Sequence, residues 1–256
     1  MVPLAEGLVE PSAPGGRPAR WAATGRSGGL SAPPFDTLNL AAYVGDDPIS
    51  VTGNRLRLAE ALGVAPEALC VMGAVHSAEL AVVQTPGTVA GVDALLTQVP
   101  GLALVALGAD CIPMALIGAD GVTVAAVHCG WRGLVLDVVG VTISALRDHG
   151  TRVAAVVLGP SACGSCYAVP PQRADEVRRR TSSLVGDAAI TRTRDGQPGI
   201  DLRLGVGARL AELGIDGSDV ALAGGCTIED PALFSYRRDA ITGRQGMAVC
   251  SIGDRT

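Results

Sequence analysis

Three short apolar runs follow one another between residues 102 and 127, and they constrain the fold more than any other feature. They cover residues 102–107, 112–117 and 122–127, and Val, Leu, Ile and Ala dominate them. Such runs, bounded by glycine-containing breaks, are typical of buried β-strands. The break between the last two reads Gly-Ala-Asp-Gly at 118–121, which is a hairpin turn signal. The sequence therefore predicts an antiparallel hairpin inside a larger sheet.

This hairpin carries a cysteine and a histidine at its open end. Cys111 precedes its first strand and His128 follows its second, so the predicted register places them opposite each other. Opposed residues have Cβ atoms about 4.5–5.5 Å apart, which is contact distance for a thiol and an imidazole. His76 ends another strand-like segment, 68–75. The three side chains provide either the ligands of an open catalytic Zn²⁺ site or, in Cys111 and His128, a nucleophilic pair.

The rest of the chain alternates helices and strands without strict βαβ regularity. A helix is expected from Pro48 to Gly63, with Asp47 as its N-cap. Further helices are expected at 134–147, 172–180 and 201–213, and strands at 153–158 and 220–223. This order predicts an α/β or α+β fold, a layered sandwich of mixed β-sheets flanked by helices. We expect a single domain over 21–256, after a Pro/Gly-rich, loosely ordered leader at 1–20.

Composition excludes several classes of function. A net charge of −5 argues against a nucleic-acid partner, and no apolar run reaches the roughly 18 residues of a membrane span. All 20 basic residues are arginine, which excludes lysine Schiff-base chemistry. The leader lacks the pattern of a signal peptide, and seven scattered cysteines fit a reducing compartment. The expected location is therefore the cytoplasm.

Other polar residues are candidates for the site. Asp110 lies beside Cys111, where a carboxylate is costly to bury without a partner, so we expect it to orient a ligand histidine or act as a base. Arginines in glycine- or aromatic-flanked loops, such as Arg26, Arg132 and Arg237, are candidates for binding phosphate or carboxylate. The segment 234–245 predicts a substrate-facing or interface strand and turn.

Cys163 and Cys166 form a Cys-x-x-Cys pair. Such a pair serves as a redox centre or as half of a four-thiolate zinc site. A second pair is missing from the sequence, and Cys129, Cys226 and Cys250 are isolated. We therefore expect Cys163 and Cys166 to pack within a loop.

Four motifs together resemble the YfiH-type family. This family was long described as multicopper polyphenol oxidase or laccase-domain proteins, and later as purine nucleoside phosphorylases. The resemblance runs in order from about residue 20 to residue 250. Its motifs are Ala-Asp-Cys-Ile-Pro at 109–113, His-Cys-Gly-Trp-Arg-Gly at 128–133, Gly-Pro-Ser-Ala-Cys-Gly-Ser-Cys-Tyr at 159–167 and Phe-Ser-Tyr-Arg-Arg-Asp at 234–239.

The resemblance implies a function and a site. It implies Zn²⁺ held by His76, Cys111 and His128, with phosphorolysis of adenosine, inosine, guanosine and methylthioadenosine. Adenosine deamination is implied as a further activity, and some members are linked to editing of peptidoglycan precursors. The partners would be a purine nucleoside and phosphate, bound by a monomer or homodimer. The substrate-binding residues would be Arg26, Asn39, Trp131, Arg132, Tyr236 and Arg237.

Two alternatives differ in their chemistry. A Cys–His hydrolase would use Cys111 as nucleophile and His128 as base, acting on an amide or a peptidoglycan precursor. A copper-dependent phenol oxidase would need many more histidines than the three present, so the copper name is not supported by the ligands available. The chain also departs from the usual family pattern at four positions near the motifs: Ala74, Ser77, Gly108 and Ala168.

Overall fold

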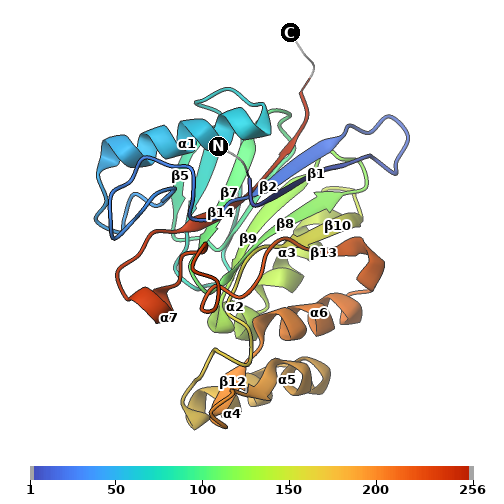
Figure 1. The fold of residues 1–256 in the computed structure, drawn as a ribbon. Coiled ribbons are helices and arrows are strands. Elements are labelled where there is room, and N and C mark those ends of the chain that lie inside the picture. The colour runs from blue at the N-terminus through green and yellow to red at the C-terminus, as the bar shows by residue number, and fades with distance from the viewer. Residues whose placement is uncertain (1–2, 254–256) are drawn as a thin grey trace.

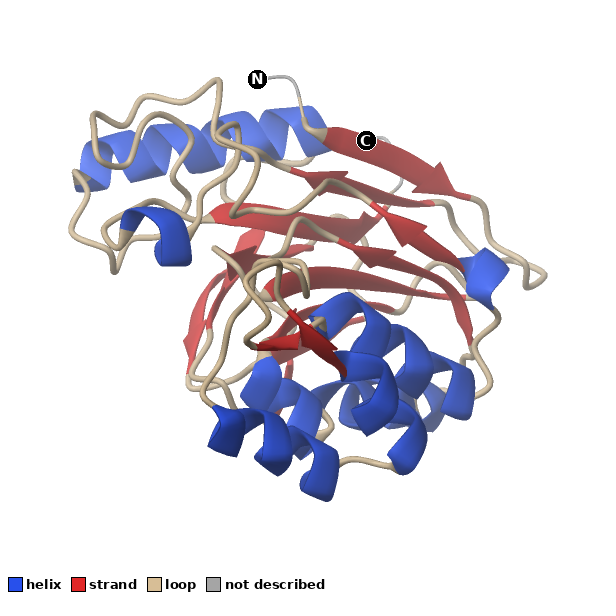
Figure 2. Ribbon diagram, turned by 60° about the horizontal axis from the view of Figure 1, so that its bottom comes forward, coloured by secondary structure: helices blue, strands red, loops and turns tan. Residues whose placement is uncertain are grey.

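The protein forms four layers, in the order helix, sheet, sheet, helices (Figures 1 and 2). The structure is a computed structural model that describes residues 3–253. Within them lie two six-stranded mixed sheets and one small two-stranded sheet. This arrangement confirms the predicted layered sandwich of mixed sheets flanked by helices.

The two large sheets are built from strands that lie far apart in the sequence. The first has the order β1-β2-β14-β7-β3-β5, and the second has the order β13-β10-β8-β9-β6-β4. The strands of the first sheet are β1 (Ala5–Val9), β2 (Ala19–Ala23), β3 (Leu69–Gly73), β5 (Gly87–Ala90), β7 (Ala103–Gly108) and β14 (Gln245–Ser251). Those of the second are β4 (Leu80–Val82), β6 (Ala94–Thr97), β8 (Ile112–Gly118), β9 (Val124–Cys129), β10 (Val153–Leu158) and β13 (Val220–Leu222), and the small sheet pairs β11 (Ile190–Arg192) with β12 (Pro198–Ile200).

Helices cover the outer faces of both sheets. One long helix, α1 (Pro48–Leu62), lies on the first sheet, and most of the others lie on the second (Figure 1). These others are α2 (Trp131–Leu136), α3 (Val138–Asp148), α4 (Pro171–Arg180), α5 (Ser183–Ala189) and α6 (Leu202–Glu212), while the short α7 (Tyr236–Asp239) lies in the loop before β14. No helix within residues 3–253 combines the length and the apolarity needed to cross a bilayer.

The central strands are apolar on both faces because both faces are covered. In β9, Val124 and Ala126 point into the core between the sheets, whereas Ala125 and Val127 pack toward the helices. The same alternation in β7 and β8 explains why their sequences read as unbroken apolar runs rather than as alternating ones.

Helix α1 follows the boundaries expected from the sequence. The Asp47 carboxylate accepts hydrogen bonds from the backbone N–H groups of Ile49 and Ser50, and Pro48 is the first helical residue. Gly63 ends the helix in the left-handed conformation, at φ 68°, which glycine adopts without steric cost.

The first twenty residues differ from the expected loose leader. Residues 5–9 form β1, which pairs antiparallel with β2 along its whole length. A Cβ on Gly7 would lie 2.7 Å from the Trp21 ring, so the glycine allows close packing. The connecting turn is also anchored, since the N–H groups of Ser12 and Ala13 donate to the carbonyl of Ala119.

The helix expected at 134–147 is two helices instead. Asp137 separates α2 from α3 in a left-handed conformation, at φ 62°. Its carboxylate accepts from the Gly140 N–H at 3.1 Å and from the Arg209 guanidinium at 2.6 and 2.8 Å. These contacts stabilise the break, which apolar periodicity alone does not reveal.

Candidate metal centre

The β8–β9 hairpin has a different register from the one predicted. Ile112 pairs with Cys129 and Pro113 with His128, which leaves Cys111 beyond the last pair rather than opposite His128. The turn is longer than the sequence suggested, because Asp120 accepts hydrogen bonds from Val122, Thr123 and the Thr123 hydroxyl. A shift of two residues preserves the face on which side chains lie, so Cys111 and His128 still converge.

His76 joins these two residues. The ligand atoms of His76, Cys111 and His128 all lie within 4.8 Å of one another. The Cys111 Sγ is 3.7 Å from His76 Nε2, and the two imidazole rings meet edge to face with centroids 4.9 Å apart. Gly130 makes room for them, since a Cβ there would lie 2.7 Å from the Cys111 Sγ and 3.1 Å from His76 Cδ2.

A buried carboxylate that sequence reasoning missed organises the two histidines. Asp93 is fully buried and its Oδ1 lies 2.8 Å from His128 Nδ1. The same carboxylate accepts the backbone N–H groups of Val75, His76 and Ser77, and the Ser77 hydroxyl. It thereby holds the left-handed conformation of His76, at φ 62°, and fixes the tautomer of His128. In the sequence, the only signal for this role was that Asp93 directly precedes an apolar run.

The charged groups of the cluster shift one another's pKa values. Burial opposes the Cys111 thiolate, but His128 and His76 outweigh it and lower the pKa of Cys111 to about 6. Burial likewise opposes the His128 imidazolium, but Cys111 and Asp93 raise the pKa of His128 to about 9. The pKa of Asp93 lies well below its usual range, because hydrogen bonds from His128 and Ser77 outweigh its burial. The thiol is therefore primed to act as a thiolate.

The three residues lie in a cleft of about 390 Å³. It is formed where the ends of β7 and β9 meet α2 and α7. Aromatic rings and two arginines line it together with the three clustered side chains: Tyr43, Trp131, Tyr167, Tyr236, Arg237 and Arg244. Of these, Tyr43, Tyr167 and Arg244 were not among the predicted substrate-binding residues.

Three of the predicted substrate-binding residues lie outside the cleft. Arg132 borders an adjoining hollow that shares His76 and Trp131 with the cleft. Arg26 donates to Asp36 and Asp239.

Asn39 is fully buried, where its amide binds Asp46 and Ala41 and accepts the Arg244 N–H. Asn39 and Arg26 therefore shape the loops that carry the site.

Asp110 does not bind either histidine of the cluster. Its carboxylate accepts from the hydroxyls of Thr227 and Ser235, both at 2.7 Å, and from the Arg237 N–H at 2.7 Å. It has a left-handed backbone, at φ 100°. Asp110 thus joins three loops of the cleft wall, and the orienting role expected for it belongs to Asp93.

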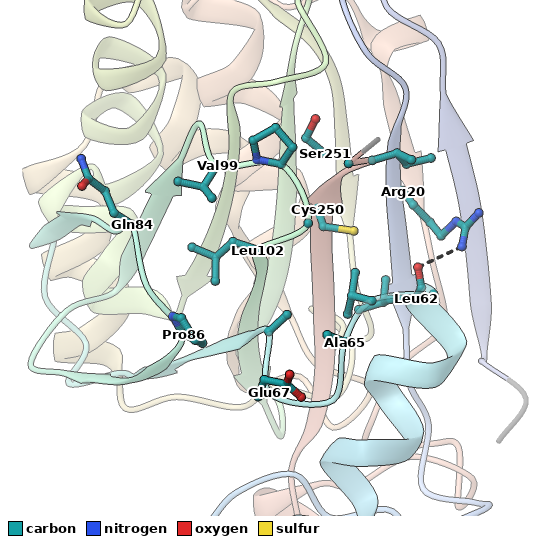
Figure 3. Close-up of a pocket in the computed structure, with 17 residues that line it drawn as sticks. Arg20, Leu62, Ala65, Glu67, Gln84, Pro86, Val99, Leu102, Cys250 and Ser251 are labelled. Carbon is teal, nitrogen blue, oxygen red and sulfur yellow. Dashed lines mark hydrogen bonds between the residues drawn. The ribbon is translucent and has the colours of Figure 1, made fainter. Parts of the chain in front are cut away.

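A larger cavity lies elsewhere, beside the C-terminal end of α1 (Figure 3). It measures about 820 Å³ and includes Arg20, whose guanidinium donates to the Leu62 carbonyl at 2.9 Å. Its other lining residues are mostly apolar or backbone groups, with Glu67 as the one carboxylate. Because it lacks a cluster of groups suited to catalysis, the smaller cleft is the better candidate.

Comparison with known proteins identifies the family. Residues 20–252 match the family described as multi-copper polyphenol oxidoreductase laccase. The chain belongs to this family. A purine nucleoside phosphorylase of Mycobacterium tuberculosis is 42% identical over 225 residues, which cover 86% of this chain and 87% of that protein.

Solved structures agree with this assignment. The YlmD protein of Geobacillus stearothermophilus is 30% identical, with a TM-score of 0.83 over 96% of this chain and 97% of that one. The hypothetical protein YfiH of Bacillus licheniformis shares the fold, with a TM-score of 0.82 at 24% identity over 92% and 93% of the two chains. The YfiH-type resemblance of the motifs is thereby confirmed.

The chain has too few histidines for the several copper ions that the family's description implies. A single blue-copper site takes two histidines, a cysteine and a weak axial ligand, and this chain contains three histidines in all. His149, the third, binds the Ala145 carbonyl at the end of α3. A cluster of further copper ions would therefore lack imidazole ligands.

The departures from the family pattern lie around the cleft. Ala74 and Gly108 line it, and a Cβ on Gly108 would lie 2.6 Å from the Cys111 carbonyl oxygen. Ser77 binds Asp93, and the Ala168 carbonyl accepts from Arg237. The changes thus affect the wall of the cleft and leave the three clustered side chains in place.

Proposed function

We propose that the protein is a zinc-dependent purine nucleoside phosphorylase. The observation that carries the proposal is the cleft itself, in which two imidazoles and a thiol lie beside aromatic rings and arginines. The Mycobacterium tuberculosis relative is a purine nucleoside phosphorylase, which supports it. Adenosine, inosine, guanosine and methylthioadenosine are the proposed substrates, and the cytoplasm is the proposed location.

The donor set suits a catalytic zinc ion. Catalytic Zn²⁺ has three protein ligands and an open position, and it accepts both histidine and cysteine. His76, Cys111 and His128 would hold it, and Asp93 would keep His128 in the tautomer that presents Nε2. Bound there, the metal would supply Lewis acidity toward phosphate, or toward water for a further adenosine deaminase activity.

The cleft residues would bind the two substrates. Tyr167 and Tyr236 offer ring faces for a purine, and the arginines offer N–H donors for phosphate. Arg237 is held in place by the Ala168 carbonyl and lies 4.5 Å from the centre of the Tyr167 ring. Arg244 lies over Tyr236. So arranged, an oxygen of monohydrogen phosphate would bond to the anomeric carbon as the glycosidic bond breaks, and the proton lost by the phosphate would balance the one taken up by the departing base.

A nucleoside assay tests this proposal. Zinc-loaded protein is incubated with inosine, with and without phosphate, and the free base and ribose 1-phosphate are measured. We expect equal amounts of both products, formed only with phosphate, and loss of activity in Cys111→Ser. Substitution of the buried Cys250 by serine, outside the cleft, is the matched control. Absence of base release by the zinc-loaded protein would refute the proposal.

A second candidate is a Cys–His hydrolase. It is favoured by the lowered pKa of Cys111 and the raised pKa of His128, which together describe a thiolate–imidazolium pair oriented by Asp93. Its substrate would be an amide or a peptidoglycan precursor. Metal content separates the two candidates, because stoichiometric metal on Cys111 leaves no free nucleophile, whereas an alkylatable thiol in the metal-free, active protein favours the hydrolase.

A further inference from the structure

A second group of metal-ligating side chains lies outside the cleft. It consists of Cys163, Cys166, Cys226 and Glu229, whose ligand atoms all lie within 4.8 Å of one another. Two of them follow β10 and two follow β13, so the group joins two loops whose paired residues are 63 positions apart. Cys226, which stands alone in the sequence, is therefore a spatial neighbour of the Cys-x-x-Cys pair.

The backbone brings the two loops together independently of these side chains. Ser161 and Cys226 form a parallel β-bridge, with the Ser161 N–H donating to Gly225 and the Thr227 N–H donating to Ser161. On the other side, the N–H groups of Cys166 and Tyr167 close a tight turn onto the Cys163 carbonyl. The backbone segments that carry the three cysteines are thus held by hydrogen bonds, which favours a metal site.

One ligand-to-ligand distance in the group is close to the spacing around a tetrahedral ion. With zinc–sulfur bonds of about 2.3 Å, ligand atoms around tetrahedral zinc lie about 3.5–3.8 Å apart. The Cys166 Sγ lies 3.3 Å from Glu229 Oε1, and the Cys163 N–H donates to the Cys226 Sγ at 3.3 Å. A backbone N–H directed at a sulfur is a common way to stabilise a thiolate ligand.

We propose that these four residues bind a structural Zn²⁺ through three thiolates and one carboxylate. Each thiol releases its proton as its sulfur–metal bond forms, and the four anionic ligands complete a closed tetrahedral shell. Arg194 contacts the Glu229 carboxylate and offsets part of the negative charge. In this proposal Cys163 and Cys166 are metal ligands in addition to packing within a loop, which is the role that the sequence suggested for them.

This site would hold the wall of the catalytic cleft. Tyr167 follows Cys166 and lines the cleft, and Thr227 follows Cys226 and donates to Asp110 beside Cys111. The two metal sites share no ligand, so each can be emptied separately. The proposal does not depend on which reaction the cleft performs.

Metal stoichiometry tests the proposal. Full-length protein is purified, loaded with Zn²⁺, freed of excess metal and analysed by elemental mass spectrometry. We expect two zinc ions per chain in the parent and in the control Cys250→Ser, and one in each of Cys111→Ser and Cys226→Ser. One ion in the parent, lost in Cys111→Ser, would overturn the proposal, as would two ions in Cys226→Ser.

Further variants keep the test valid if Cys226→Ser does not fold. Glu229→Gln replaces an exposed side chain, and we expect it to weaken retention of one zinc ion against a chelator by at least tenfold. Cobalt-loaded Cys111→Ser should still show intense thiolate-to-metal charge transfer from the remaining site. Unchanged zinc retention in Glu229→Gln, or no charge transfer in cobalt-loaded Cys111→Ser, would contradict the proposal. A count of free thiols in the unreduced, denatured parent is a further check. Two missing thiols would indicate a Cys163–Cys166 disulfide and would also contradict the proposal.

Discussion

At the scale of single residues, the buried carboxylate of Asp93 organises the candidate site, although Asp93 lies outside the sequence motifs. It binds His128 and three successive backbone N–H groups around His76. Outer-shell carboxylates of this kind typically contribute 10–100-fold to metal affinity. We expect Asp93→Asn to weaken zinc binding by about that factor, measured by competition with a chelator. Asp120→Asn, which changes a turn carboxylate of the β8–β9 hairpin, should leave the affinity unchanged; equal effects would contradict the role of Asp93.

The lowered pKa of Cys111 predicts an unusual thiol in the metal-free protein. Burial is outweighed by His128 and His76, so the thiolate persists as the pH falls until the pKa near 6 is reached. The rate at which iodoacetamide alkylates Cys111 should therefore rise with increasing pH, with a midpoint near pH 6. The substitution His128→Ala should move this midpoint to higher pH. A midpoint at the ordinary cysteine value of about 8.5 in the parent would show that the imidazoles do not stabilise the thiolate.

We expect metal binding by the cluster to require glycine at position 130, because any side chain there would enter the space of Cys111 and His76. A Cβ there would lie 2.7 Å from the Cys111 Sγ, so Gly130→Ala should lower zinc occupancy of this site while far-ultraviolet circular dichroism stays the same. Gly207→Ala is the control, since nothing lies within 4 Å of a Cβ at that position of α6. Full occupancy in Gly130→Ala would mean that the cluster tolerates a wider spacing.

At the scale of elements, the sequence predicts well where periodicity and caps agree. The boundaries of α1 follow from Asp47, Pro48 and Gly63, and β10 covers residues 153–158 as expected. The pairing register of β8 and β9 is harder to predict, because their turn is set by hydrogen bonds to Asp120 that the turn motif does not reveal. Strand β1 was missed although it pairs with the next strand in the chain, β2, because the Pro- and Gly-rich residues between them favour a loose segment.

The break between α2 and α3 is stabilised by Asp137, which was also missed. Asp137→Ala removes the cap on Gly140 and the pair with Arg209. With a cap worth about 1 kcal/mol and a partly exposed ion pair worth up to about 1 kcal/mol, we expect the free energy of unfolding to fall by about 1–2 kcal/mol. Urea denaturation measures this change, and Asp148→Ala, at the exposed end of α3, should alter stability by less than about 0.5 kcal/mol. A loss no larger than that of the control would contradict this role.

At the scale of the whole molecule, the sequence predicted the layers and the candidate ligands but not how the loops meet. The apolar runs required covered sheets, and the motifs singled out His76, Cys111 and His128. The group of Cys163, Cys166, Cys226 and Glu229 depends on a β-bridge between distant loops. Buried partners such as Asp93 are invisible for the same reason, since tertiary contacts alone bring them to the site.

The central claim is that His76, Cys111 and His128 form an open metal centre that works on purine nucleosides. The most direct test is to titrate metal-free protein with Zn²⁺ while following phosphate-dependent release of hypoxanthine from inosine. Activity should rise with added zinc in the parent and in the control Cys250→Ser, and stay absent in Cys111→Ser at every zinc concentration. Activity in the metal-free protein, or in Cys111→Ser, would contradict the claim.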